Sequence, residues 1–155
     1  MKTVEPGAVL RGAGAGLLVI VPLSALRAVI DNETGNFEDS GWVVLFGLGL
    51  LAAYVVAGTV AALRAPGTPL SNGMLAGIGA FVLWVPLRIV IWVARSESQG
   101  LISGSDPVFT FGQIFGQLLF AAAFGLIGGV IGGRRMARTT PVGEGDHGTA
   151  VPPRG

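Results

Sequence analysis

Long apolar stretches separated by short polar segments dominate the chain. A bilayer core about 30 Å thick is crossed by about 20 apolar residues of α-helix. Strands of a membrane barrel alternate apolar and polar positions, whereas these stretches are apolar on all sides. The pattern therefore predicts an all-α polytopic membrane protein, a bundle of four transmembrane helices with antiparallel neighbours. The predicted spans lie at about residues 8–30, 42–63, 73–94 and 109–133.

Basic residues are concentrated on one side of these spans. Seven of the ten Lys and Arg residues lie near the start of the first span, between the second and third, or after the fourth. Six of the nine Asp and Glu residues lie in the other two connections. Segments rich in Lys and Arg stay on the cytoplasmic side of a membrane. We therefore expect a multi-pass protein of the bacterial plasma (inner) membrane, with its N- and C-termini in the cytoplasm.

The composition agrees with a membrane protein and removes several kinds of chemistry. Hydrophobic residues make up 51% of the chain and charged residues 12%, whereas soluble domains carry about 25% charged residues. The chain has no Cys, its one His is His147, and its net charge of +1 is not typical of a nucleic-acid-binding protein. Residues 139–155 are rich in Pro and Gly, so we expect a disordered cytoplasmic tail after a transmembrane domain of residues 1–138.

A weak internal repeat relates the two halves of the predicted bundle. Val21-Pro22-Leu23 in the first span matches Val85-Pro86-Leu87 in the third, at an offset of 64 residues. The ends of the second and fourth spans match at an offset of 70. Two units of two helices each would be parallel and related by an axis along the membrane normal. Coincidence among the many Gly, Ala and Val residues is the alternative interpretation.

Glycines recur at four-residue spacing within the spans, a pattern typical of a glycine zipper. Lipid tails are as apolar as Leu, so membrane helices associate by close packing at small residues. The pattern predicts either packing within the four-helix bundle or a homo-oligomer interface on the fourth span. The pairs Gly112/Gly116 and Gly128/Gly132 have this spacing. The predicted helix-packing residues are Gly12, Gly16, Gly73, Gly77, Gly125, Gly129 and Gly133.

Arg88 is the charged residue that lies within the hydrophobic part of a span. It is about 9 Å from the outer end of the third span. Trp84 and Trp92 lie one turn to either side, so the guanidinium can stack between two indoles. Arg88 can instead extend to the interface and pair with the acidic residues of the first loop. The candidate polar cluster at comparable depth is Ser24, Arg27, Arg88, Gln113 and Gln117.

The pattern as a whole resembles a class of protein. Four short spans, a core rich in Gly and Ala, and a Pro in the first and third spans resemble small four-helix integral membrane proteins of bacteria whose function is uncharacterised. Nine Arg against one Lys resembles proteins encoded by GC-rich genomes, such as those of actinobacteria. This resemblance implies the class and assigns no functional residue.

The spans contain no acid–base or nucleophile pair, so we expect no enzymatic activity, no cofactor and no metal. We expect a protein that acts by helix association, as an accessory subunit or a homo-oligomeric membrane scaffold. Its partners would be the lipid bilayer and another membrane helix, with no role for nucleic acid. The alternative is a small channel or carrier with an outward-facing vestibule around Arg88 that binds an anion or a lipid head group.

Overall fold

The computed structural model describes residues 4–34, 41–95 and 110–139, and no strand occurs in these ranges. Each of its four helices contains a stretch long and apolar enough to cross a membrane, with a mean hydropathy of 2.0 to 2.3. The prediction of an all-α chain with four such helices is thereby confirmed. The predicted tail lies outside the described residues, except that Thr139 ends the last helix. The helices are α1 (Pro6–Thr34), α2 (Trp42–Arg64), α3 (Pro69–Arg95) and α4 (Phe111–Thr139).

Local sequence explains where the helices begin and end. Pro6 and Pro69 open α1 and α3, because the first helical position needs no N–H donor and favours the backbone angle that proline imposes. At the end of α2, the N–H of Ala65 donates to the carbonyl oxygens of Ala61 and Ala62. Pro66 follows directly, and proline cannot continue a helix. A turn of four residues therefore separates α2 from α3.

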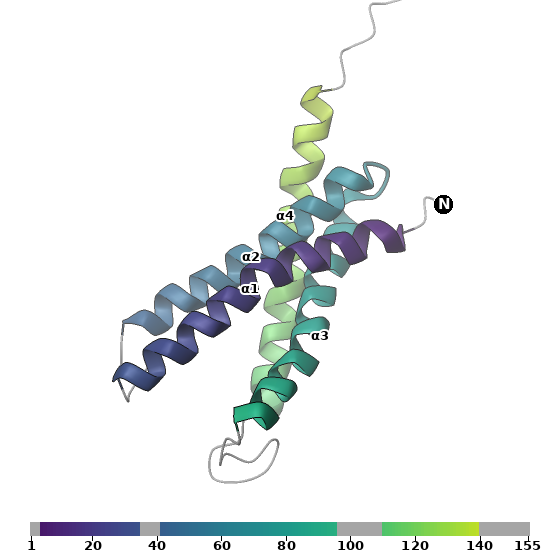
Figure 1. Cartoon of the computed structure of the whole chain (residues 1–155). Helices are drawn as coiled ribbons and strands as arrows, with labels where there is room; N and C mark the ends of the chain where they lie inside the picture. Colours follow the sequence, from purple (N-terminus) through teal and green to yellow (C-terminus); the bar gives the residue numbers. More distant parts are fainter. Residues whose placement is uncertain (1–3, 35–40, 96–109, 140–155) are drawn as a thin grey trace, which may run out of the picture.

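The helices alternate in direction, so the bundle has two distinct ends (Figure 1). We call the terminal end the one that holds the start of α1, the turn between α2 and α3, and the C-terminal part of α4. The loop end holds the end of α1, the start of α2, the end of α3 and the start of α4. Figure 1 shows the α1–α2 pair diverging from the α3–α4 pair toward the loop end. The closest packing is therefore nearer the terminal end.

Two glycines let α1 lie close to both α2 and α3. A methyl group at Gly12 would lie 2.8 Å from the Cβ of Ala61 and 2.9 Å from the Cβ of Ala76. At Gly16 it would lie 2.9 Å from the Cβ of Ala57. These distances are shorter than Cβ contacts in proteins, so only glycine fits. The backbone of α1 thus comes within contact of alanines on two neighbouring helices.

Glycines on α4 meet those on α3 directly. A methyl group at Gly125 would lie 2.6 Å from the carbonyl oxygen of Gly73 and 3.0 Å from the Cα of Gly77. At Gly129 it would lie 2.7 Å from the carbonyl oxygen of Pro69, and at Gly133 it would lie 3.2 Å from the ring of the same proline. Backbone therefore packs on backbone at Gly125 and Gly129, and at Gly133 the backbone of α4 meets a proline ring.

A second row of glycines on α4 contacts α2. A methyl group at Gly128 would collide with the carbonyl oxygen of Val55 and would lie 3.0 Å from the Cα of Gly58. At Gly132 it would lie 2.7 Å from the Cβ of Ala62. Two adjacent rows of glycine therefore let α4 pack against two helices at once. Among the described helices, α1 and α4 are the pair that does not pack together.

Several of these contacts follow the offsets of the predicted repeat. Gly12 faces Ala76, and Gly16 faces Ala80 across the α1–α3 contact, both at an offset of 64. Gly58 faces Gly128 across the α2–α4 contact, at an offset of 70. Contacts between equivalent positions are what a two-fold axis between the units produces. The symmetry is incomplete, because α2 packs on α3 whereas α1 does not pack on α4.

Larger side chains fill the core where the helices separate. Of the fourteen buried hydrophobic residues in the part of the chain that the structure describes, ten are Ala, and the others are Ile20, Phe46, Tyr54 and Phe81. Ile20, Phe46 and Phe81 lie further toward the loop end than the contacts of Gly16, and Tyr54 lies level with those contacts, beside Ala53. Partly buried Trp84 packs against the cluster that holds Ile20, Tyr54 and Phe81. The buried side chains therefore become larger toward the loop end, where the helices diverge.

The outside of the bundle is apolar. Between 17% and 28% of the most apolar window of each span is buried inside the protein. Large hydrophobic side chains such as Leu18 and Phe111 are 79% and 86% exposed. Such a surface is stable in lipid and costly in water. The fold is therefore that of a multi-pass membrane protein, with most of the side chains of its spans exposed on the outside of the bundle.

We expect Gly125→Ala and Gly128→Ala each to lower the free energy of unfolding by about 1–3 kcal/mol, because the added methyl group overpacks a backbone contact. The matched control is Gly14→Ala, whose methyl group would meet no described atom within 4 Å. We expect it to leave the stability unchanged or to raise it by up to about 1 kcal/mol, because alanine favours a helix more than glycine does. Unfolding by sodium dodecyl sulfate in mild detergent micelles measures all three, and equal stability of Gly128→Ala and Gly14→Ala would contradict this packing.

Candidate functional site

The structure brings together Ser24 of α1, a member of the candidate polar cluster, and Trp84 of α3, a residue predicted to stack on Arg88. The indole Nε1 of Trp84 donates a hydrogen bond to the hydroxyl oxygen of Ser24 at 3.4 Å. The indole ring also stacks on Phe81, with centroids 6.2 Å apart and planes 27° apart. A tryptophan whose N–H meets a hydroxyl can be buried without a polar penalty. This bond joins α1 to α3 on the loop-end side of the glycine contacts.

Arg27 and Arg88 lie about one turn further toward the loop end on the same two helices. Arg27 is exposed and Arg88 is half-buried. Because α1 and α3 run in the same direction and contact each other, the two arginines lie at the same end of the bundle. The side chain of Trp92 lies outside the described residues, so the predicted stacking of Arg88 between two indoles stays a prediction.

Gln113 has a local role that the sequence analysis did not assign. Its side-chain Oε1 accepts a hydrogen bond from the N–H of Thr110 at 3.3 Å. In return, the N–H of Gln113 donates to the hydroxyl of Thr110 at 3.3 Å. This reciprocal pair is a capping box, which satisfies two N–H groups at the start of a helix. Its signature, Thr followed by Gln three residues later, was present in the sequence.

The five residues of the candidate polar cluster do not form a single site in the described structure. Gln113 and Gln117 belong to α4, which does not pack on the helix that carries Ser24 and Arg27. Gln113 is exposed, and Gln117 is half-buried one turn further along. The vestibule around Arg88 therefore stays a prediction.

Asn72 of α3 is fully buried, and it is the buried polar side chain of the described residues. Its Oδ1 accepts a hydrogen bond from the backbone N–H of Glu5 at 3.0 Å. Its Nδ2 donates to the carbonyl oxygen of Thr68 at 3.0 Å and to the hydroxyl of Thr68 at 2.7 Å. One amide thus joins the start of α1 to the turn before α3. The sequence analysis missed this group, although Thr68-Pro69 is a helix-start signal.

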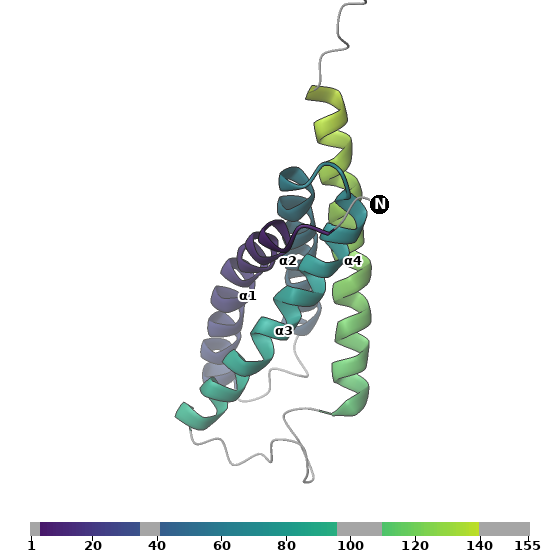
Figure 2. The same cartoon turned by 90° about the vertical axis from the view of Figure 1, so that its right-hand side faces the viewer.

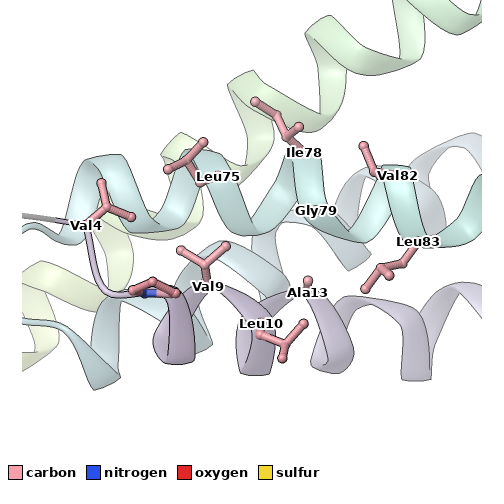
Figure 3. A pocket seen from close by; sticks show the side chains of 10 residues that line it. Val4, Val9, Leu10, Ala13, Leu75, Ile78, Gly79, Val82 and Leu83 are labelled. Atoms are coloured by element: carbon pink, nitrogen blue, oxygen red, sulfur yellow. The ribbon is translucent and has the colours of Figure 1, made fainter.

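An apolar groove of about 480 Å³ runs between α1 and α3 near the terminal end. Figure 3 shows Leu75, Ile78 and Val82 of α3 on one side and Val9 and Leu10 of α1 on the other. Hydrocarbon side chains line it almost completely, so it offers nothing to orient a polar substrate. In addition, no group of three His, Cys, Asp or Glu side chains is placed to hold a metal ion in the residues that the structure describes.

The outward face of α4 carries a glycine pair that has no partner among the described residues. At Gly112 and Gly116, an added methyl group would have no neighbour within 4 Å. Phe111 and Phe115 lie beside them, with their rings stacked 6.5 Å apart at 8°. The other four-residue glycine pairs of the described helices all contact a neighbouring helix. This pair and its aromatic neighbours, here called the α4 outer face, form the candidate association site.

We expect Asn72→Ala to lower the free energy of unfolding by about 1–3 kcal/mol, because it removes the acceptor of the Glu5 N–H and the side-chain donor to Thr68, and leaves a cavity at a fully buried position. Amide hydrogen exchange in the first turn of α1 should accelerate, since the N–H of Glu5 loses its acceptor. Ser71→Ala is the matched control, because Ser71 is exposed and adjacent. An Asn72→Ala variant with the stability and exchange of the control would remove this role.

A double-mutant cycle measures the contact between α1 and α3. We expect Ser24→Ala and Trp84→Phe to show a coupling of about 0.6 kcal/mol in unfolding free energy, the usual value for a hydrogen bond between membrane helices. The control cycle pairs Trp84→Phe with Thr59→Ala, because the Thr59 hydroxyl donates to Val55 within α2. Its coupling should be close to zero, and equal couplings in the two cycles would refute the bond.

Comparisons with protein-family models, with curated proteins and with solved structures found no match to this chain. A function for the chain therefore has to be argued from its own residues. Four features of the described structure bear on function. They are the α4 outer face, the Ser24–Trp84 contact, the buried Asn72 and the exposed arginines at the two ends of the bundle.

Proposed function

We propose that the protein acts without catalysis, by association of membrane helices, as an accessory subunit or a homo-oligomeric scaffold of a bacterial plasma membrane. The observation that carries this proposal is the α4 outer face. Gly112 and Gly116 leave the helix backbone accessible on the side opposite the packed glycines. In lipid, such a face lets a second helix approach closely enough for many van der Waals contacts.

The surroundings of the α4 outer face support the proposal. Phe111, Phe115, Leu119 and Phe120 are exposed around the two glycines. The large side chains can insert into a partner helix, and the small-residue groove between them can receive side chains of that partner. Both features on one helix suit packing of helix on helix. The inner glycines of α4 are already used within the chain. Association through the outer pair would therefore leave the four-helix bundle unchanged.

The orientation that we propose places the terminal end in the cytoplasm. Arg64 ends α2 at this end, and three arginines lie in the last two turns of α4. Basic residues next to membrane helices favour the cytoplasmic side. The α4 outer face then lies in the outer half of the membrane, where a partner helix would meet it.

Native mass spectrometry of the full chain, extracted in mild detergent from its host, tests the proposal. We expect wild-type protein as a homo-oligomer or with one membrane protein in fixed stoichiometry. Gly116→Ile should weaken that complex by roughly tenfold or more, about 1.4 kcal/mol, because a branched side chain prevents close approach. The bundle should still fold, since the added side chain meets no described neighbour within 4 Å at its Cβ.

Gly14→Ile is the matched control, because Gly14 lies on α1 with no described atom within 4 Å of an added Cβ. It should retain the complex at wild-type strength. A wild-type protein recovered as a single chain would refute the proposal. The same holds if Gly116→Ile and Gly14→Ile assemble equally well, because the contact would then lie elsewhere.

A further inference from the structure

The last helix continues beyond the packed part of the bundle. Gly133 is the last glycine of α4 that lies against α3, at Pro69, and the helix ends at Thr139. Figures 1 and 2 show this end of α4, coloured yellow, projecting past the other three helices. Arg134, Arg135 and Arg138 are exposed on the projecting turns. We call these three residues the α4 arginine patch.

The three guanidinium groups share one side of the helix. Successive residues of an α-helix are rotated by about 100°, so positions 134, 135 and 138 fall within an arc of about 100°. Because α4 is helical through this region, the arginines lie within about two turns of one another along the axis. A helix therefore holds three cationic side chains together at the boundary of the apolar span.

Acidic residues are scarce around the α4 arginine patch. The helices that pack on α4 are α2 and α3, and residues 41–95 and 110–139 contain no Asp or Glu. Arg64 adds a fourth exposed cation at the terminal end, where the last turn of α2 contacts α4 near Gly132. Glu5 is the carboxylate that the described residues place at this end. The terminal end of the bundle thus carries a net positive charge next to the membrane.

We propose that the α4 arginine patch binds the phosphate-bearing head groups of anionic lipids in the leaflet at the terminal end. Guanidinium groups match phosphate geometry through paired N–H donors. Clusters of four or more basic residues directly beside a membrane helix are typical of anionic-lipid recognition. The position of the patch commits the ligand to a membrane lipid, because the arginines begin where the apolar contacts of α4 end. Binding here is separate from association through the α4 outer face.

Native mass spectrometry of the purified full chain in mild detergent tests this binding with phosphatidylglycerol, phosphatidylcholine and inorganic phosphate as probes. We expect retained phosphatidylglycerol and little retention of the other two. Arg134→Gln/Arg135→Gln/Arg138→Gln should weaken phosphatidylglycerol binding by roughly 100-fold, since each basic residue near an anionic surface contributes about fivefold. Detergent-solubilised protein removes any effect of these arginines on membrane orientation.

Two controls separate the site from general charge and from misfolding. The triple variant with Lys at the same three positions keeps the charge and should retain binding within a few-fold. Arg11→Gln removes an exposed arginine of α1, a helix that does not pack on α4, and should bind as wild type. If the triple Gln variant does not fold, Arg138→Gln in the last turn of α4 should still weaken binding by about fivefold. In the wild-type protein, raising the salt to about 1 M should weaken binding strongly, because charges on the surface are then screened within about 3 Å.

Three outcomes would overturn the proposal. Unchanged phosphatidylglycerol binding in the folded triple Gln variant would place the lipid elsewhere. Equal retention of phosphatidylcholine would show that charge is not recognised. Inorganic phosphate bound as tightly as phosphatidylglycerol would make the patch a site for a soluble anion rather than for a lipid.

Discussion

Lipid tails are as apolar as leucine, so four apolar helices in a bilayer gain little from simply being buried against one another. They gain stability from close approach, because dispersion forces act only between atoms in contact. In this chain the helices approach closely enough at Gly73, Gly77, Gly125 and Gly128, where backbone lies against backbone. Every other feature of the bundle is arranged around that contact.

The shape of the bundle follows from where its small residues are placed. Near the terminal end the core is Gly and Ala, and the helices lie close together. Toward the loop end Ile20 and Phe81 occupy the core, and the helices diverge. Each of these two regions contains a polar contact that joins α1 to α3. Asn72 joins α1 to α3 at the narrow end, and Ser24 with Trp84 joins the same helices further along.

The fourth helix carries three different surfaces along one element. Its inner glycines hold α2 and α3, its outer glycines Gly112 and Gly116 remain open to a second helix, and its last turns carry arginines at the membrane boundary. The three regions lie on different sides or at different depths of the same helix. The proposed protein association and the proposed lipid binding would therefore use opposite ends of α4, and neither would need the glycines that pack the bundle.

The sequence by itself determined the four spans, their approximate limits and the small residues able to bring helices close, because each depends on local composition and spacing. The tertiary structure decided which glycines are used inside the chain, since the same four-residue spacing occurs at Gly112/Gly116 and at Gly125/Gly129. It also separated Gln113, which caps its own helix, from Ser24 and Arg27. Spacing along one helix identifies a face, but which helix meets that face depends on how all four pack together.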